Sequence, residues 1–97
     1  MKTISSIEKA LHKSKPMLSR RYGVTQIGTF GSYIRGTAKR KSDLDLLVDF
    51  GRPISLIGFV QLKNDLSDRL DVPVDLVMKR ALKPGIGKSV LKEVGYV

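Results

Sequence analysis

The sequence predicts an α+β fold, a small mixed β-sheet flanked by helices, in a single domain over residues 1–97. Segments with helical spacing of apolar residues alternate along the chain with short runs of Val, Ile, Leu and Phe that are typical of strands. A chain of 97 residues with 41% hydrophobic content can bury one modest core. Neither an internal repeat nor a low-complexity linker divides the sequence, so one domain is expected.

The composition favours an anionic partner. Eighteen Lys and Arg against nine Asp and Glu give a formal charge of +9, a balance typical of proteins that bind nucleotide phosphates, nucleic acid or an acidic protein. The alternative is that the charge only keeps a small domain soluble. The chain has no cysteine, which agrees with a reducing compartment. We expect a cytoplasmic protein without a membrane partner, because no apolar run has the length of a signal core or a membrane span.

The N-terminal segment predicts a helix and then a strand. Ser5 and Glu8 have the spacing of a capping box, and the helix is expected at about residues 5–21. Its apolar positions recur at helical spacing: Ile7, Leu11 and Leu18. Pro16 should either kink this helix or begin a second short segment, because proline removes a hydrogen-bond donor and crowds the preceding turn. Residues 24–30, rich in β-branched and aromatic side chains, predict the first strand.

A sharp turn at Gly31-Ser32 leaves that strand, and the basic stretch to Ser42 predicts a short helical turn and a loop. Residues 43–50 predict the second strand. Its side chains alternate between two faces. One face is apolar and should join the core: Leu44, Leu46, Val48 and Phe50. The other face begins as a candidate site: Asp43, Asp45, Leu47 and Asp49.

The C-terminal half predicts a helix, a strand and a second helix. Ser55 can cap a helix that runs to about Arg69, with apolar residues at helical spacing. Residues 73–78 predict the third strand, and residues 88–96 a short terminal helix. The terminal helix is expected to turn three side chains inward: Val90, Leu91 and Val94.

Two aspartates in an apolar strand are the main chemical signal. Asp43 and Asp45 lie on one face with Cα atoms roughly 6 to 7 Å apart, so their side chains can converge on one ion. Repulsion between them calls for a divalent cation or for a raised pKa on one partner. Ligation by oxygen alone suits Mg²⁺ or Mn²⁺ rather than zinc.

Asp75 is the third candidate ligand, because it interrupts the apolar run Val-Asp-Leu-Val. If its strand lies beside residues 43–50, Asp75 joins the pair, and three carboxylates can hold two metal ions. Asp49 lies roughly 13 Å from Asp45 along the strand and is expected outside the site. The Gly31-Ser32 turn offers backbone N–H groups and a hydroxyl to phosphate oxygens.

These residues resemble a known family. Gly31-Ser32, ten residues and then Asp43-Leu44-Asp45 are similar to the G-S-x₁₀-D-x-D signature of the DNA polymerase β-like nucleotidyltransferase superfamily. Within it, the chain resembles the minimal nucleotidyltransferases (MNT), which include the antitoxins of MNT–HEPN toxin–antitoxin systems. The likeness covers nearly the whole chain and ends with Glu93, Tyr96 and Val97.

The resemblance implies a catalytic and metal-binding triad of Asp43, Asp45 and Asp75, with Mg²⁺ or Mn²⁺ as cofactor and Asp75 helping to activate the acceptor hydroxyl. This follows from the match of residues to the family motif, as does ATP as the nucleotide substrate.

The resemblance also implies which residues bind the nucleotide. Gly31 and Ser32 would hold the triphosphate, and Ser42 would belong to the same nucleotide-binding set. Arg35 matches an arginine that commonly follows the Gly-Ser turn, where it either contacts phosphate or supports the loop.

The activity implied is AMP transfer from ATP to a hydroxyl, and in the antitoxin branch to a tyrosine of a HEPN toxin. Two alternatives stay open at this point: an antitoxin that neutralises its toxin by binding alone, and a basic nucleic-acid-binding module. Nucleic acid is the less favoured partner, because three Tyr, three Phe and no Trp leave little surface for base stacking.

Overall fold

The computed structural model describes residues 3–39 and 42–97. Over these residues the chain forms one four-stranded mixed sheet with helices against it, which confirms the predicted α+β fold. The strands are β1 (Val24–Phe30), β2 (Leu44–Phe50), β3 (Val74–Met78) and β4 (Gly95–Tyr96). The helices are α1 (Ile4–Tyr22), α2 (Ser32–Arg35), α3 (Leu56–Leu70) and α4 (Ile86–Glu93), with a 3₁₀ turn η1 (Lys79–Ala81).

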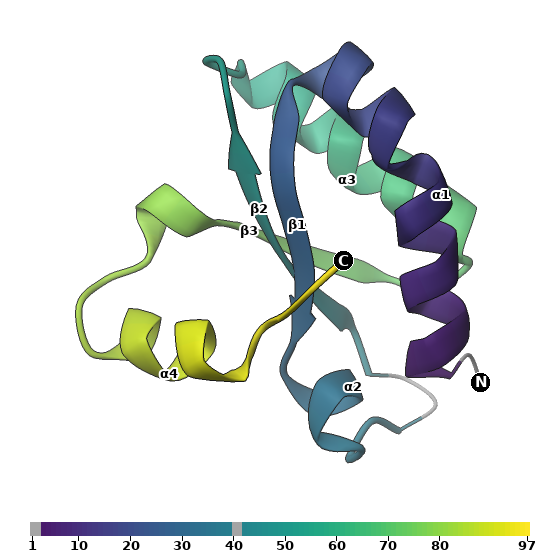
Figure 1. Cartoon of the computed structure of the whole chain (residues 1–97), viewed down its shortest axis with the longest axis vertical. Coiled ribbons are helices and arrows are strands. Elements are labelled where there is room, and N and C mark those ends of the chain that lie inside the picture. The colour runs from purple at the N-terminus through teal and green to yellow at the C-terminus, as the bar shows by residue number, and fades with distance from the viewer. Residues whose placement is uncertain (1–2, 40–41) are drawn as a thin grey trace.

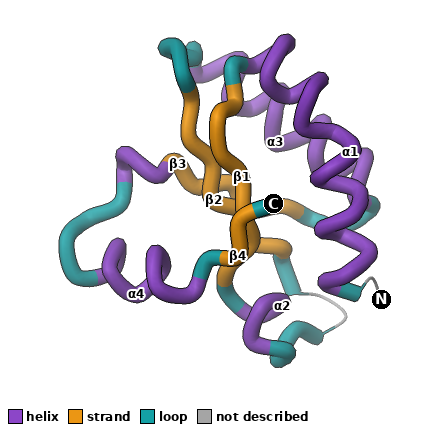
Figure 2. Tube along the Cα trace, viewed as in Figure 1, coloured by secondary structure: helices purple, strands orange, loops and turns teal. Residues whose placement is uncertain are grey.

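The strands follow the order β3-β2-β1-β4 across the sheet. β1 pairs antiparallel with β2 on one side and with β4 on the other, whereas β2 and β3 are parallel and are joined through α3. Figure 1 shows α1 and α3 together on one side of the sheet, with α4 standing on the other side. The short β4, close to the C-terminus of the chain, lies at the edge of the sheet beside β1 (Figure 2). The candidate site lies at the β3 edge of the sheet and at the turn that follows β1.

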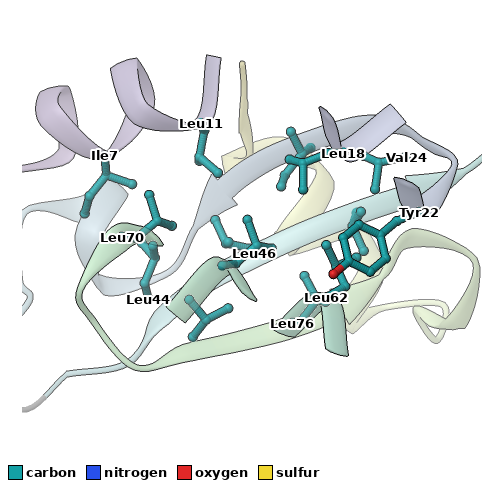
Figure 3. Close-up of a cluster of buried hydrophobic side chains, with 14 of the residues drawn as sticks. Ile7, Leu11, Leu18, Tyr22, Val24, Leu44, Leu46, Leu62, Leu70 and Leu76 are labelled. Carbon is teal, nitrogen blue, oxygen red and sulfur yellow. The ribbon is translucent and has the colours of Figure 1, made fainter. Parts of the chain in front are cut away.

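The core lies between the sheet and the helices α1 and α3 (Figure 3). The predicted apolar face of β2 is buried there as expected: Leu44, Leu46, Val48 and Phe50. Leu47 points to the opposite face and is also buried, although it lies outside that core cluster. Its neighbours on that face, Asp45 and Asp49, are only half-buried. One face of β2 thus fixes the strand in the core and leaves the other for chemistry.

The helix α1 starts earlier than predicted, and it excludes one of the two alternatives for Pro16. Thr3, not Ser5, is the N-cap, since its hydroxyl accepts a hydrogen bond from the Ser6 backbone N–H. The helix continues through Pro16 and ends at the left-handed Gly23, so no second segment begins at the proline. Pro16 and His12 both lie on the exposed face of α1, where water can bond the His12 carbonyl that lacks a helical partner. Within the described residues no helix is long and apolar enough to span a bilayer.

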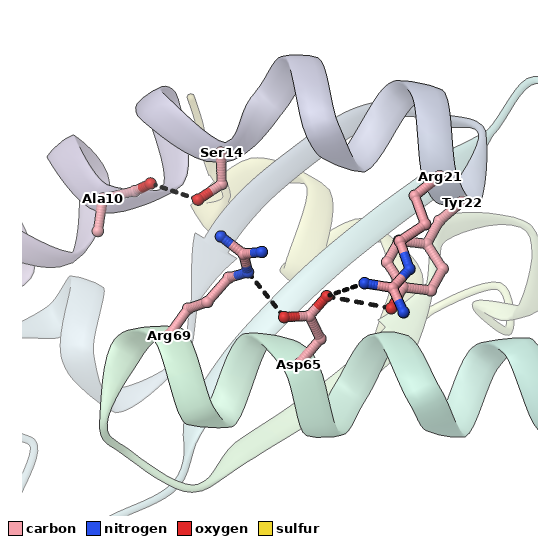
Figure 4. Close-up of polar contacts among 6 residues, drawn as sticks. All are labelled: Ala10, Ser14, Arg21, Tyr22, Asp65 and Arg69. Carbon is pink, nitrogen blue, oxygen red and sulfur yellow. Dashed lines mark hydrogen bonds and ion pairs between the residues drawn. The ribbon is translucent and has the colours of Figure 1, made fainter.

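One carboxylate of α3 ties it to α1 (Figure 4). The Asp65 oxygens accept hydrogen bonds from the Tyr22 hydroxyl at 3.1 Å and from Arg69 Nε at 2.7 Å. Arg21 Nη1 lies 3.7 Å from the same carboxylate. Burial and this bond to Asp65 raise the pKa of Tyr22 above its usual value. The α1–α3 layer is therefore fixed by polar contacts as well as by the core.

The predicted helix over residues 88–96 is confirmed as far as Glu93 and is wrong for its last three residues. α4 ends at Glu93, and the next residues form β4 beside β1. The reason lies in Gly28, where a Cβ atom would come within 2.8 Å of the Gly95 carbonyl oxygen, so the bare backbone lets a strand pair closely. The inward face is also only partly as expected, because Leu91 is 45% exposed whereas Val90 and Val94 are half-buried.

Candidate active site

The parallel pairing of β2 with β3 brings Asp45 directly opposite Asp75. Asp43 immediately precedes β2, so the three acidic residues of the predicted triad lie at the same end of this strand pair. Asp45 is half-buried, whereas Asp43 and Asp75 are exposed. The register follows from the apolar residues on either side, because Leu44 pairs with Val74 and Leu46 with Leu76 in the core.

The three carboxylates act on one another electrostatically. Burial is the main cause that raises the pKa of Asp45, followed by the negative charges of Asp75 and Asp43, while the cation of Arg35 opposes the rise. Anionic oxygens under mutual repulsion are a donor set that suits a hard divalent cation. In residues 3–39 and 42–97, however, no three Asp, Glu, His or Cys side chains already form a finished metal-ligating group. The strand register nevertheless brings Asp45 and Asp75 side by side, next to Asp43.

The Gly31 turn lies against this cluster. Phe30, the last residue of β1, pairs with Asp45, and Gly31 follows with a φ of 78°. A Cβ atom on Gly31 would collide with the Asp45 carboxylate. Only glycine combines that backbone conformation with so close an approach. The turn that offers N–H groups to an anion is therefore placed next to the aspartate that would hold a cation.

The remaining predicted nucleotide-binding residues lie around this turn. Ser32 begins α2, half-buried, and its carbonyl accepts a hydrogen bond from the Thr37 N–H at 2.9 Å. Arg35 ends α2 with its side chain 57% exposed. Ser42 adjoins Asp43, and its hydroxyl accepts a hydrogen bond from the Lys39 N–H at 2.8 Å. Ser42 thus closes the loop that leads into β2, a contact that the sequence did not indicate.

Glu93 contacts the same turn, although the sequence predicted no role for it. Its Oε2 accepts a hydrogen bond from the Gly31 backbone N–H at 3.1 Å, and its Oε1 from Arg35 Nη1 at 2.7 Å. The hydrogen bond from Gly31 is the main cause that lowers the pKa of Glu93, and Arg35 adds to it. The available signal was weak: an isolated acid in a basic C-terminal segment, about sixty residues from the turn that it contacts.

Asp49 lies apart from the cluster, further along β2. Arg80 Nε lies 3.2 Å from its carboxylate, and Arg80 Nη2 donates to the Phe50 carbonyl oxygen. This carboxylate is therefore engaged in an ion pair at the other end of the strand, in agreement with its expected position outside the site.

A small mixed sheet that presents paired strand aspartates beside a Gly-Ser turn defines the polymerase β-like nucleotidyltransferase class. Residues 11–97 match the family described as Nucleotidyltransferase domain. The chain belongs to this family and is a nucleotidyltransferase of minimal size.

Three similar proteins carry names that are more specific than the description of the family. The chain is 52% identical to the protein adenylyltransferase MntA of Thermococcus cleftensis, over 100% of this chain and 98% of the relative. A solved structure assigned as a minimal nucleotidyltransferase is similar at a TM-score of 0.80 and 35% identity, covering 97% of this chain and 95% of the other. A toxin–antitoxin structure with AMP-PNP is similar at a TM-score of 0.75 and 29% identity, over 92% and 70% of the two chains.

Proposed function

We propose that this protein is an antitoxin that transfers AMP from ATP to a hydroxyl, specifically a tyrosine, of a partner HEPN toxin in the cytoplasm. The single domain over residues 1–97 would carry the reaction, with Mg²⁺ or Mn²⁺ held by Asp43, Asp45 and Asp75. The relatives support the class of reaction: an MntA relative is called a protein adenylyltransferase, and a neighbouring toxin–antitoxin structure carries AMP-PNP.

The observation that carries the proposal is the position of Asp45, opposite Asp75 in the β2–β3 register and against Gly31. A nucleoside triphosphate needs its phosphates held and its negative charge neutralised at the same point. The Gly31-Ser32 turn would supply the first function and the carboxylates, through bound cations, the second. A structural role alone does not account for three mutually repelling acids at the end of an otherwise apolar strand pair.

The chemical step requires the attacking oxygen, the phosphorus and the leaving oxygen to be aligned. The acceptor hydroxyl oxygen attacks the α-phosphorus of ATP, the bond from that phosphorus to the bridging oxygen breaks, and pyrophosphate leaves. Asp75, which is exposed at the sheet edge, would take the hydroxyl proton. A divalent ion, when bound, neutralises the charge that develops on the phosphate oxygens. Gly31 and Ser32 orient the leaving phosphates, and Arg35 adds a positive charge beside them.

The acceptor is proposed to be a protein because the chain is 52% identical to a relative that is called a protein adenylyltransferase. Asp75 is on the outer strand of the sheet, where an incoming protein side chain can approach it. A phenolic hydroxyl fits this arrangement because it is long enough to reach an edge carboxylate and is more acidic than an alcohol.

The test is transfer of label from α-labelled ATP to the toxin that co-purifies with the native protein. We expect label on the toxin with the wild type and with Asp49→Asn, which removes an acid of the same strand outside the cluster. Asp45→Asn should abolish it. Label that persists with Asp45→Asn would contradict the catalytic assignment.

The same variants separate the proposal from neutralisation by binding. If Asp45→Asn loses transfer but still protects cells from the toxin, antitoxin action does not depend on catalysis. If the protein instead binds RNA with an affinity that falls steeply with salt and ignores Asp45, a nucleic-acid-binding function replaces the proposal.

A further inference from the structure

The C-terminal end of α4 is joined to the nucleotide turn by one side chain. Glu93 uses its two oxygens separately, one for the Gly31 backbone N–H and one for the Arg35 guanidinium. Both partners belong to the turn and short helix that follow β1. In Figure 1 the end of α4 and α2 occupy the same lower part of the molecule, on either side of the end of β1.

The position of the Gly31 backbone determines the distance between the nucleotide turn and Asp45. Its backbone has a φ of 78° and a ψ of −151°, and its Cα lies against the Asp45 carboxylate. Glycine adopts this conformation without strain but is also free to leave it, so contacts with the surroundings are needed to hold the turn in one place. The hydrogen bond from the Gly31 N–H to the Glu93 carboxylate is such a contact. Glu93 therefore helps to hold the turn at its present distance from the Asp45 carboxylate.

Arg35 needs an anchor for a related reason. Arg35 lies at the end of the short helix that follows Gly31, and Gly31 itself lies against the Asp45 carboxylate. A long, half-exposed cationic side chain near these carboxylates can swing onto them and occupy the oxygens that a metal ion would use. The 2.7 Å contact with Glu93 Oε1 holds the guanidinium at the turn instead. Arg35 therefore keeps its positive charge near the phosphate site and does not occupy the carboxylate oxygens that a metal ion would bind.

Glu93 is itself held from the side of the sheet. Directly after it, β4 pairs with β1, and the Val97 N–H donates to the Ile27 carbonyl oxygen at 3.0 Å. Lys15 Nζ donates to the Val97 carbonyl oxygen at 2.8 Å. These hydrogen bonds hold the C-terminal segment against β1 and α1. The position of Glu93 relative to the Gly31 turn is therefore well defined.

We propose that Glu93 is a positioning residue for nucleotide binding: it holds the Gly31 turn at its spacing from Asp45 and anchors Arg35 beside the phosphate site. This deepens the proposed function and rests on it. The proposal gives the C-terminal segment a part in binding the triphosphate, although that segment carries none of the residues of the nucleotidyltransferase motif.

The test measures the affinity of the purified full-length chain for AMP-PNP with Mg²⁺, by calorimetry, well below the unfolding temperature of each variant. Glu93→Ala removes both hydrogen-bond acceptors and should raise the dissociation constant about tenfold or more, the scale expected for removal of a charge-assisted hydrogen bond. Glu93→Gln keeps an acceptor for the Gly31 N–H but removes the negative charge that faces Arg35, so it should recover part of the affinity.

A second comparison separates the two contacts. In an Arg35→Ala background, Glu93→Gln should weaken binding less than it does in the wild-type background, because only the weaker hydrogen bond from Gly31 to a neutral amide remains to be felt, while Glu93→Ala should weaken binding more, through the loss of the Gly31 contact. Two exposed residues serve as controls and should bind like the wild type: Lys92→Ala on the same helix and Asp68→Ala, which removes an acid from α3.

Wild-type affinity in Glu93→Ala would overturn the inference and leave the proposed function standing. Tighter binding would also overturn it, because Glu93 would then occupy the phosphate site rather than shape it. Absence of AMP-PNP binding by the wild type would contradict the proposed function and the inference together. If Glu93→Ala does not fold, Glu93→Gln decides the question: its neutral amide no longer pairs with the Arg35 cation, so wild-type affinity would overturn the role of Glu93 as the anchor of Arg35.

Discussion

Asp45 of β2 and Asp75 of β3 occupy directly opposed positions of a parallel strand pair. About thirty residues and the whole of α3 separate them along the chain. Parallel strands need a crossover connection, and α3 supplies it while it packs against the core face of the sheet. The helix that buries the core thus also determines that these two carboxylates meet.

The first prediction concerns metal binding by this pair. Mg²⁺ should raise the unfolding temperature of the wild type, because an ion that binds only the folded state stabilises it, by about 2.7 kcal/mol at a hundredfold excess over the dissociation constant. Asp45→Asn and Asp75→Asn should each lose most of the Mg²⁺ effect. Thermal unfolding with and without Mg²⁺ checks this.

Asp49→Asn is the matched control for metal binding, since Asp49 shares the strand and its facing but is paired with Arg80. It should keep the full response to Mg²⁺. An equal response in Asp45→Asn and the wild type would show that the ion binds elsewhere.

The second prediction uses two glycines of the same turn. Gly31 and Gly36 both have positive φ, but a Cβ atom on Gly31 would meet the Asp45 carboxylate, whereas nothing lies within 4 Å of one on Gly36. Gly36→Ala should cost about 1 to 2 kcal/mol of stability from backbone strain and leave nucleotide transfer nearly intact. Gly31→Ala should in addition reduce transfer about a hundredfold or more, because it displaces the turn from Asp45. Equal transfer rates in the two variants would contradict the importance of this contact.

The third prediction is the pH dependence of the Glu93 contact. Because Gly31 and Arg35 lower the pKa of Glu93 below its usual 4.5, the folded state favours the ionised carboxylate. The resulting stability is fully present above about pH 4.5, declines as the pH falls below that value, and is lost below the lowered pKa of the folded state. The wild type should therefore be more stable than Glu93→Gln at neutral pH, with the difference vanishing in acid.

Thermal unfolding from pH 7 to pH 3 measures this difference. Glu8→Gln, at the other glutamate of the chain, is the control and should show a smaller stability change across the range. A difference between wild type and Glu93→Gln that widens in acid would have the wrong sign for the proposed contact.

The fourth prediction concerns the polar link between α1 and α3. Tyr22→Phe removes the hydrogen bond to Asp65 and should cost about 1 to 2 kcal/mol in urea unfolding. Asp65→Ala should cost more, about 2 to 3 kcal/mol, because it also leaves Arg69 without its partner. The double variant should be less destabilised than the sum, since both changes remove the same bond. Asp68→Ala, exposed on the same helix, should change stability by less than about 0.5 kcal/mol.

Local patterns were enough to predict most elements. Period-two alternation identified the core face of β2, and Ser55 marked the start of α3, where its hydroxyl accepts from the Gly58 N–H. The predictions of secondary structure were wrong where a contact with a residue distant in the sequence overrode the local pattern. Gly95 and Tyr96 have no strong strand pattern, and they form β4 because Gly28 of β1 allows close pairing.

The sequence by itself determined the chemistry of this protein: the Gly-Ser turn, the spaced aspartates and the acidic interruption of the third strand are all readable as residue types at fixed separations. Only the tertiary structure decided which groups meet. The parallel register aligned Asp45 with Asp75, and the terminal strand carried Glu93 to Gly31 and Arg35. Such contacts depend on strand pairing and core packing over many residues, and those long-range interactions leave no local spacing in the sequence from which to read them.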